Sequence, residues 1–261
     1  MSFADKVVAI TGAAGGIGRE LCRLFAGAGA AIGALDKNET VIAVAEELAA
    51  SGARTKAAVA DIANEAAVAA AFAEIAGALG PVDILVNNAG ISRGPSLERT
   101  TGEIWRDDVA ANLNGAYYCA RAVIPDMKAR RAGAIVNIGS VNGLSALGDP
   151  AYSAGKAGMI SLTKALAVEL GRYGIRANIV CPGTVRTPIW EHRVVRNPDL
   201  LAELTKWYPL GRVADPMDVA RAVAFLASDD AAAITGVVLP VDCGLSAGNI
   251  VMGRELTLED F

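Results

Sequence analysis

Two residues whose types and spacing suit acid–base chemistry are Tyr152 and Lys156, in the segment Ala151–Lys156. Residues four apart share one face of a helix, so the ammonium group would lie one turn from the phenol. A free phenol has a pKa of about 10 and is a poor base at neutral pH. A cation at roughly 5 Å, in a medium of effective dielectric about 20, stabilises phenolate by about 3 kcal/mol, or roughly two pKa units. The pair therefore predicts a tyrosine whose pKa is lowered towards the range useful for general acid–base catalysis.

The same spacing also occurs at the start of an ordinary amphipathic helix. The surrounding elements must therefore show whether Tyr152 and Lys156 lie in a binding site. Short apolar runs alternate with helical patterns along the whole chain. Strands are predicted at 6–11, 30–35, 55–60, 82–86, 134–138, 176–180 and 237–241, and helices at 19–28, 40–51, 65–79, 101–130, 151–173 and 216–227. This alternation predicts an α/β fold with a doubly wound parallel sheet and helices on both faces. We expect a single domain over residues 1–261, and the tail from residue 245 has no strong period.

The composition is globular and excludes several classes of function. Of the 261 residues, 53% are hydrophobic and 20% are charged, which supplies an ample core, and the net charge is −4. An acidic balance without a Lys/Arg run argues against a nucleic-acid partner. The sequence has no apolar run of the roughly 20 residues needed to cross a bilayer, and residues 1–6 lack a signal pattern. We therefore expect a cytoplasmic protein with no membrane partner.

The four cysteines, Cys22, Cys119, Cys181 and Cys243, are far apart in the sequence and lie in apolar surroundings. They contain no Cys-x-x-Cys pair. We expect buried, reduced thiols and no metal site.

A glycine cluster follows the first predicted strand. Gly12, Gly15, Gly16 and Gly18 stand between that strand and a helix. A strand, a glycine loop and a helix in this order direct backbone N–H groups and a helix N-terminus at a phosphate. A tight strand-to-helix turn without a ligand is the alternative.

Asp36 ends the second predicted strand, 18 residues beyond Gly18. A carboxylate roughly 20 residues after a glycine loop binds the adenosine ribose hydroxyls in dinucleotide-binding folds. Such a carboxylate would repel a 2′-phosphate and therefore favours NAD over NADP, although Lys37 beside it leaves the preference open. Helix capping is the alternative role for Asp36.

Polar clusters follow four of the predicted strands, namely residues 12–18, Asp36, Asp61 and residues 87–90. The carboxyl ends of parallel strands meet at one edge of the sheet, where ligands bind in such folds. The sequence therefore predicts one binding site at this edge.

The chain resembles the short-chain dehydrogenase/reductase family over about residues 5 to 245. The resemblance is carried by the glycine motif of residues 11–18, by Asn-Asn-Ala-Gly at 87–90, by Pro182-Gly183 with Thr187, and by Asn112, Ser140, Tyr152 and Lys156 in order. It implies a Rossmann-type fold, a nicotinamide dinucleotide cofactor and an oxidoreductase activity.

The resemblance also implies roles for single residues. Tyr152 would exchange the hydroxyl proton of the substrate, while Lys156 lowers its pKa and holds the nicotinamide ribose. Ser140 would hydrogen-bond the substrate oxygen, and Asn112 would position a water molecule between Lys156 and solvent.

The residues implied to bind the cofactor are Gly12, Gly16, Ile17, Gly18, Asp36, Asp61, Ile62, Asn88, Ala89, Gly90, Tyr152, Lys156, Pro182, Gly183, Val185 and Thr187. Among them, Asp61 and Ile62 would contact adenine, and Val185 and Thr187 would hold the carboxamide.

The residues implied to bind substrate are Ser92, Arg93, Ser140, Asn142, Tyr152 and Trp190, with segment 188–212 as a lid over the pocket. Arg93, Arg193 and Arg196 suit an anionic substrate, but solvated loop charges are the favoured interpretation. His192 is expected to be a surface or packing residue.

The leading hypothesis is an NAD(H)-dependent oxidoreductase that interconverts a small secondary alcohol and its ketone. The alternatives are an NADPH-linked 3-oxoacyl-carrier-protein reductase and a catalytically idle dinucleotide-sensing protein. The resemblance further implies a homotetramer in which helices 101–130 and 151–173 pair between subunits.

Overall fold

The computed structural model of the chain describes residues 1–260, except for the side chain of His192. Within these residues, all strands belong to one parallel sheet in the order β3-β2-β1-β4-β5-β6-β7. The strands are β1 (Val7–Thr11), β2 (Ala31–Asp36), β3 (Thr55–Val59), β4 (Ile84–Asn87), β5 (Gly133–Ile138), β6 (Ile175–Pro182) and β7 (Val238–Val241). The strand order reverses between β1 and β4, which places a crevice beyond their carboxyl ends. The predicted fold class, a doubly wound parallel sheet with helices on both faces, is confirmed.

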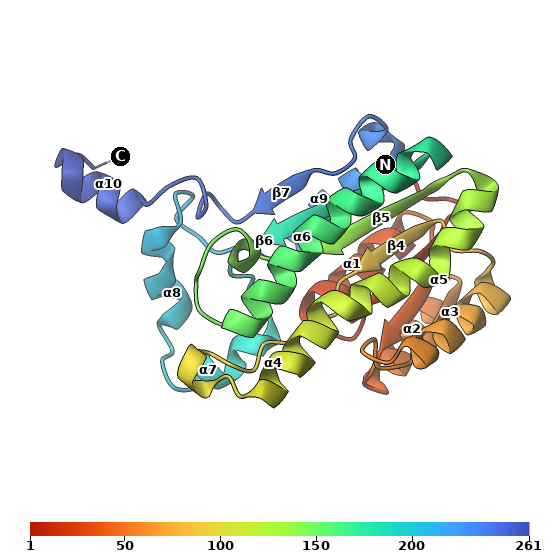
Figure 1. The fold of residues 1–261 in the computed structure, drawn as a ribbon, viewed down its shortest axis with the longest axis horizontal. Helices are drawn as coiled ribbons and strands as arrows, with labels where there is room; N and C mark the ends of the chain where they lie inside the picture. The colour runs from red at the N-terminus through yellow and green to blue at the C-terminus, as the bar shows by residue number, and fades with distance from the viewer. Residues whose placement is uncertain (261) are drawn as a thin grey trace.

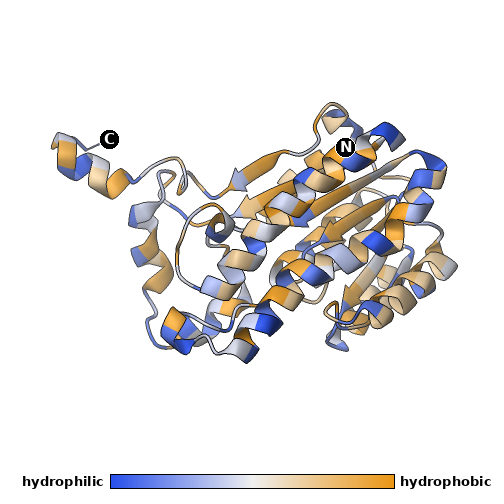
Figure 2. Ribbon diagram, in the orientation of Figure 1, coloured by the Kyte–Doolittle hydropathy of each residue, from blue (hydrophilic) through white to orange (hydrophobic). Residues whose placement is uncertain are grey.

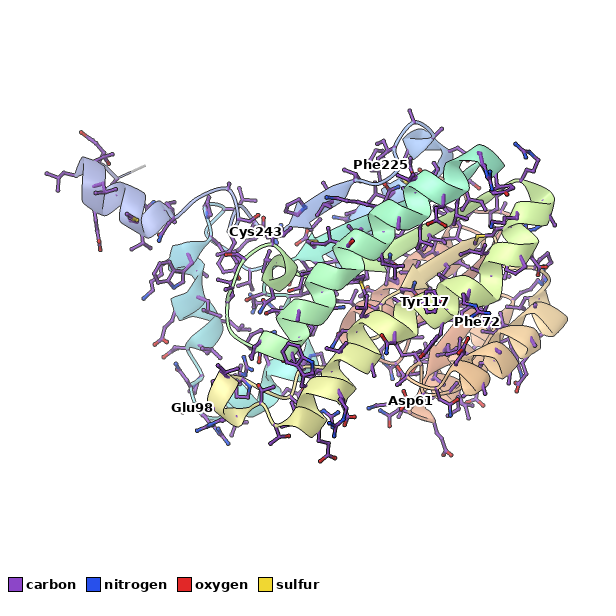
Figure 3. The ribbon with its side chains drawn as sticks, in the orientation of Figure 1. Asp61, Phe72, Glu98, Tyr117, Phe225 and Cys243 are labelled. Carbon is purple, nitrogen blue, oxygen red and sulfur yellow. The ribbon has the colours of Figure 1, made fainter. Side chains whose placement is uncertain are left out.

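Helices cover both faces of the sheet (Figure 1). Buried side chains of α1 (Gly16–Gly27), α2 (Thr40–Ala50) and α9 (Pro216–Ala227) pack on one face. Those of α3 (Glu65–Leu79), α5 (Gly115–Arg130) and α6 (Pro150–Leu170) pack on the other. Figure 2 shows the hydrophobic strands enclosed between these two layers. In Figure 3, Phe72 of α3 and Tyr117 of α5 mark where two neighbouring helices run along the same face.

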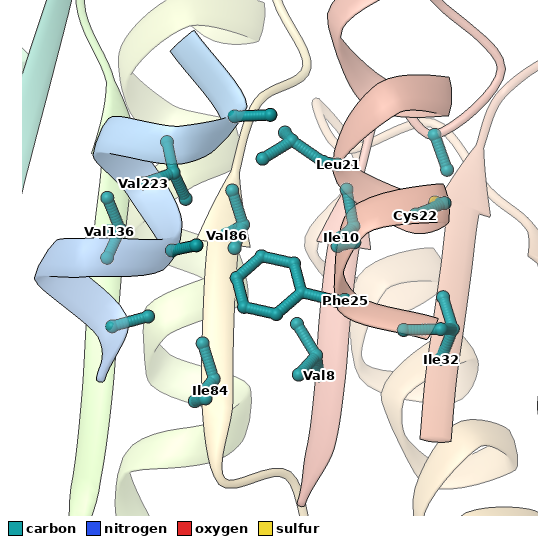
Figure 4. Close-up of a cluster of buried hydrophobic side chains, with 14 of the residues drawn as sticks. Val8, Ile10, Leu21, Cys22, Phe25, Ile32, Ile84, Val86, Val136 and Val223 are labelled. Atoms are coloured by element: carbon teal, nitrogen blue, oxygen red, sulfur yellow. The ribbon is translucent and has the colours of Figure 1, made fainter. Parts of the chain in front are cut away.

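The five inner strands are buried because both of their faces carry apolar side chains, whereas the edge strands β3 and β7 are mostly half-buried. Val8 pairs in register with Ile32 on β2 and with Ile84 on β4, which forms a continuous apolar row. The ring of Phe25 from α1 lies over this row, as Figure 4 shows, and is fully buried. Since side chains alternate along a strand, Val7 packs into the opposite layer.

The helix predicted over residues 101–130 is interrupted in its middle. It consists of α4 (Gly102–Val109), a π-helical segment (Ala110–Asn114) and α5. The carbonyl oxygen of Asp108 accepts a hydrogen bond from the Asn112 side chain at 2.8 Å. A side chain that bonds the carbonyl at the i−4 position competes with the regular helix ladder, and π turns are frequent at functional sites.

The segments towards the C-terminus contain short helices. Residues 188–212 include α7 (Glu191–Val194) and α8 (Leu200–Leu204). The tail has no predicted period, yet it forms α10 (Ile250–Thr257), which extends away from the sheet in Figure 1. Asn249 caps this helix by accepting a hydrogen bond from the N–H of Met252 at 3.0 Å. A helix that is stabilised by a local cap need not show an apolar period, and so the sequence pattern did not predict α10.

Within residues 1–260, no helix is long and apolar enough to cross a membrane. Cys22, Cys119 and Cys181 are buried free thiols, as predicted. Cys243 is free but only half-buried, so the prediction of burial was wrong there, because this residue lies beyond the end of β7 rather than inside a strand.

Candidate active site

The glycine loop joins β1 to α1 in a conformation that side chains would block. Gly12 has a φ of 65°, and a Cβ on Gly18 would lie 2.0 Å from the carbonyl oxygen of Gly12. Helix α1 begins at Gly16, not at Arg19 as predicted, because glycines at a helix start carry little of the apolar pattern. The first helical turn therefore includes Gly16, Ile17 and Gly18, whose N–H groups have no carbonyl partner within the helix. Such a loop can hold a pyrophosphate.

Asp36 lies at the end of β2 and faces this loop. One carboxylate oxygen accepts the N–H of Ala14 at 3.1 Å, and the other accepts the N–H of Asn38 at 3.0 Å. The carboxylate is therefore held beside the backbone of the glycine loop, and Lys37 next to it is exposed.

Asp61 and Ile62, just beyond the end of β3, have different surroundings. Asp61 is exposed, and its carboxylate accepts the N–H of Ala63 at 2.9 Å. Ile62 is buried against the start of α5, where a Cβ on Gly115 would lie 2.5 Å from its Cδ1 atom. The pair presents one charged and one apolar side chain at the same edge of the sheet.

The segment after β4 is tied to the end of β1. The Asn88 side chain donates hydrogen bonds to the carbonyl oxygens of Thr11 and Gly12, at 3.0 and 3.1 Å. The Thr11 hydroxyl accepts the N–H groups of Asn88 and Ala89. These bonds fix residues 88–90 beside the glycine loop.

The backbone of Gly90 lies close to the side chains of Asn112 and Lys156. A Cβ on Gly90 would lie 2.6 Å from Asn112 Oδ1 and 3.3 Å from Lys156 Nζ. The Asn112 amide donates to the carbonyl oxygens of Ile91 and Asp108, at 2.6 and 2.8 Å. Within the described residues, its Oδ1 atom is buried without a hydrogen-bond partner. A buried acceptor beside an ammonium group suits a proton path.

Lys156 is buried on α6, one turn after Tyr152. Its Nζ atom donates to the carbonyl oxygen of Ile138 at 2.7 Å and lies 5.6 Å from the centre of the Tyr152 ring. Burial lowers the pKa of Lys156 to about 8. The ammonium group of Lys156 therefore lies near the phenol of Tyr152, as predicted.

The predicted lowering of the Tyr152 pKa is wrong for the protein without its cofactor. Burial is the largest effect and raises the pKa of Tyr152, while a hydrogen bond with Ser140 lowers it. The neighbouring cation favours phenolate, but forming phenolate in a poorly solvated place costs more free energy than the cation returns. Ser140, rather than Lys156, is the neighbour that opposes this effect here.

The loop between β5 and α6 is held by side chains. The Ser140 hydroxyl accepts the N–H of Asn142 at 3.1 Å. The Asn142 amide donates to the Gly148 carbonyl and to the Ser153 hydroxyl, each at 3.3 Å. Helix α6 then begins at Pro150, a favourable first residue because it needs no N–H partner. Ser140 and the helix that bears Tyr152 are thereby fixed relative to each other.

The end of β6 contacts the glycine loop. A Cβ on Gly16 would lie 2.8 Å from Cγ2 of Thr187, so the two segments touch. Pro182 and Val185 are buried, and a Cβ on Gly183 would meet the ring of Tyr208 at 3.3 Å. Residues 182–187 therefore border the same crevice as the loop after β1.

The predicted substrate residues lie on the more exposed side. Ser92 is exposed and Trp190 is half-buried, with the Arg193 guanidinium 4.8 Å from the Trp190 ring centre. The guanidinium of Arg93 pairs with Asp107 at 2.6 Å and Asp108 at 3.5 Å, so two carboxylates already neutralise it. The side chain of His192 lies outside the described part of the chain.

Sequence reasoning missed Asp108, whose carboxylate is fully buried. Tyr208 lies in the predicted lid segment, and its hydroxyl accepts the N–H of Thr184 at 3.1 Å. An acidic residue four positions before Asn112, within an apolar helix face, was the available signal for Asp108.

Comparison with known proteins places the chain among oxidoreductases. The family model described as enoyl-(acyl carrier protein) reductase matches residues 12–246. An uncharacterised oxidoreductase of Schizosaccharomyces pombe is 43% identical over 261 residues, which is 100% of this chain and 98% of that protein.

Two solved structures extend this similarity. An oxidoreductase of the short-chain dehydrogenase/reductase family from Burkholderia thailandensis is 51% identical, with a TM-score of 0.91 and 98% of each chain covered. A 3-oxoacyl-[acyl-carrier protein] reductase with bound NAD from Brucella melitensis is 35% identical, with a TM-score of 0.85 and 94% and 92% coverage of this chain and that one.

Proposed function

Because this chain belongs to the short-chain dehydrogenase/reductase family, we propose that it is an NAD(H)-dependent oxidoreductase that interconverts a small secondary alcohol and its ketone. The observation that carries the proposal is the grouping of Ser140, Tyr152 and Lys156 at the carboxyl edge of the sheet. Ser140 hydrogen-bonds the phenol, and Lys156 is buried one helical turn away. A protein that only senses a dinucleotide has no use for a phenol with these neighbours.

The residues present fit a nicotinamide dinucleotide. The glycine loop excludes side chains at the start of α1, and Gly90 keeps space open beside Asn112 and Lys156. The residues proposed to hold the cofactor are Gly12, Gly16, Ile17, Gly18, Asp36, Asp61, Ile62, Asn88, Ala89, Gly90, Tyr152, Lys156, Pro182, Gly183, Val185 and Thr187. When bound, its nicotinamide ring accepts or supplies the hydride.

The chain's own residues then transfer the substrate proton. In the oxidation direction, the Tyr152 oxygen accepts the hydroxyl proton while the carbon–hydrogen bond of the alcohol breaks. Ser140 stabilises the charge that develops on the substrate oxygen. Lys156 stabilises the phenolate, and the Oδ1 atom of Asn112 holds a water molecule through which the proton reaches solvent. Reduction of a ketone uses the same groups in reverse, with Tyr152 as the acid.

Asp36 supports the choice of NAD over NADP. Its carboxylate is fixed beside the glycine loop by the N–H of Ala14, where a 2′-phosphate would meet like charge. We expect Asp36→Ser to reduce the preference for NAD, measured as the ratio of kcat/KM values for the two cofactors, by at least about 10-fold. Glu39→Gln, on an exposed carboxylate nearby, serves as the matched control. An unchanged ratio in Asp36→Ser would assign cofactor choice to another residue.

Substrate is proposed to bind against Ser92, Asn142, Trp190 and the aliphatic stem of Arg93, under the lid of residues 188–212. The lid presents apolar surface, since Ile189 and Val195 are exposed at 65% and 83%. The half-buried Trp190 adds aromatic surface from the same segment. This lining suits a small, largely apolar substrate more than an anionic one.

The alternative is a 3-oxoacyl-carrier-protein reductase, for which NADPH is the expected cofactor. The similarity to the Brucella melitensis reductase favours the substrate class of this alternative, whereas the NAD bound to that reductase does not favour NADPH. A panel of secondary alcohols, polyols and hydroxy acids with NAD, and of 3-oxoacyl thioesters with NADH and NADPH, separates the two. Faster turnover of small alcohols with NAD supports the proposal. Faster turnover of the thioesters with NADPH supports the alternative.

A homotetramer is proposed for the assembled enzyme, with the α4–α5 and α6 helices pairing between subunits. Val168 on α6 and Tyr117 on α5 expose 83% and 42% of their surface in the single chain, which supplies apolar area for such contacts. Light scattering at micromolar concentration tests the assembly. A monomeric mass would refute it.

A further inference from the structure

Asp108 carries a buried carboxylate that the chemistry above does not use. Its side chain is 1% exposed, at the end of α4. One carboxylate oxygen accepts the backbone N–H of Arg93 at 3.1 Å, and the other accepts the Arg93 Nε–H at 3.5 Å. A buried charge is costly unless it is paired and hydrogen-bonded, so the Asp108 carboxylate depends on these two contacts with Arg93. They attach the loop after residues 88–90 to the helix that carries Asn112.

The same loop is attached a second time through Asn112. The Asn112 amide donates to the Ile91 carbonyl at 2.6 Å and to the backbone carbonyl of Asp108 at 2.8 Å. Both amide hydrogens are therefore used, and the Oδ1 atom is directed towards the space between Gly90 and Lys156. The orientation of Asn112 depends on where Ile91 and Asp108 are held.

The catalytic helix packs directly on this junction. A Cβ on Gly155 would lie 3.0 Å from Cβ of Asn112 and 3.8 Å from the backbone carbonyl oxygen of Asp108. Gly155 stands between Tyr152 and Lys156 on α6. A shift of the π segment would therefore displace both Tyr152 and Lys156.

We propose that Asp108 is a positioning residue that clamps residues 91–93 against the π segment and so orients Asn112 towards Lys156. This inference rests on the proposed function, because it assigns a role within the same proton path. It also assigns Arg93 to the clamp rather than to recognition of an anionic substrate. Asp107, which binds the exposed end of the same guanidinium at 2.6 Å, lies outside the clamp.

The test compares Asp108→Asn with Asp107→Asn. Loss of the buried carboxylate leaves an amide beside the Arg93 Nε–H, so the clamp opens. We expect kcat to fall about 10- to 100-fold, because misplacement of a reacting group by about 1 Å has effects of that size. KM for NAD and for the alcohol should stay within about twofold, as expected when an interaction is lost only in the transition state. Asp107→Asn should leave both parameters unchanged.

Two further readouts separate positioning from general damage. In an Asn112→Ala background, Asp108→Asn should cause no additional loss of kcat, since both act through one group. Hydrogen–deuterium exchange on the cofactor-free protein should be at least about 10-fold faster for the Arg93 amide in Asp108→Asn than in Asp107→Asn. If Asp108→Asn does not fold, Arg93→Leu replaces it and should lower kcat in the same way.

The inference is overturned by an unchanged kcat, by a rise confined to the substrate KM, by additive losses with Asn112→Ala, or by unchanged exchange at Arg93. Tyr152→Phe is assayed alongside. Full activity in Tyr152→Phe would reject the proposed function itself. An inactive Tyr152→Phe with a fully active Asp108→Asn would reject only the clamp.

Discussion

At the scale of single residues, Tyr152 shows that a neighbouring cation does not alone determine a pKa. Burial raises the pKa of the phenol, and Ser140 opposes that rise through a hydrogen bond. The Lys156 ammonium is engaged by the Ile138 carbonyl at 2.7 Å. Ser140 therefore has two roles in the proposed reaction, one on the substrate oxygen and one on the phenol.

Ser140→Ala should affect both the rate and the pH dependence of alcohol oxidation. Removing a hydrogen-bond donor from the developing oxyanion lowers kcat by about 100-fold. Removing the bond that lowers the Tyr152 pKa raises that pKa, so the rise of kcat/KM with pH should move to higher pH. The pH profile of kcat/KM, which reports the free enzyme, measures this. Ser161→Ala, on the exposed face of α6, is the control, and an unmoved profile in Ser140→Ala would contradict this assignment.

At the scale of elements, the close packing of α6 on the π segment depends on Gly155. Gly155→Val would place a Cβ 3.0 Å from Cβ of Asn112, with two more methyl groups beyond it. Overpacking of this kind costs about 1–3 kcal/mol of unfolding free energy and displaces Asn112, so activity should fall more than stability alone explains. Chemical denaturation and kcat of the same samples measure the two effects.

Gly77→Val is the matched control for that substitution. Gly77 lies on the exposed side of α3, and a Cβ there would meet no atom within 4 Å. It should keep or slightly gain stability, because valine has a higher helix propensity than glycine, with kcat unchanged. Equal losses of kcat in the two variants would contradict a specific role for the α6–π contact.

Elements with a strong local pattern were predictable from the sequence, and those shaped by tertiary contacts were not. The seven strands and five of the six long helices expected between residues 6 and 241 are present, and the sixth, over residues 101–130, is divided by the π segment. The π segment was missed because it depends on the Asn112 amide reaching Ile91 and Asp108, and no periodicity reports such contacts. Helix α10 was missed because a two-turn helix with a local Asn249 cap carries too few apolar positions.

The candidate site also has some features that the sequence predicted and others that depend on tertiary contacts. The four-residue spacing of Tyr152 and Lys156 indicated acid–base chemistry, and the family resemblance implied the roles of Asn112 and Ser140. The engagement of Arg93 by two acidic residues was not predictable, since its partners lie 14 and 15 positions away. Asp108 was unnoticed for the same reason.

At the scale of the whole molecule, the buried Lys156 couples global stability to pH. Its pKa is about 8 in the folded, cofactor-free protein and about 10.4 when unfolded. Between these values the unfolded chain binds more protons, so stability should rise with pH, by up to about 1.4 kcal/mol per pH unit. Below about pH 8 both states are charged and this contribution is constant.

Urea denaturation between pH 7 and pH 10 measures that coupling. The other titrating groups are shared with Lys156→Met, which lacks only this amine. The difference in unfolding free energy between wild type and Lys156→Met should therefore change in favour of the wild type as pH rises. Parallel curves for the two proteins would mean that the Lys156 pKa is not lowered by burial.

The central claim is that Tyr152 transfers the proton in an NAD-linked oxidation of a secondary alcohol. Its most direct test is NADH formation, followed by absorbance at mildly alkaline pH, in wild type and Tyr152→Phe, with NADH affinity measured on both. We predict turnover in the wild type, loss of turnover by at least about 10³-fold in Tyr152→Phe, and near-equal NADH binding. Undiminished turnover in Tyr152→Phe with NADH still bound would contradict it.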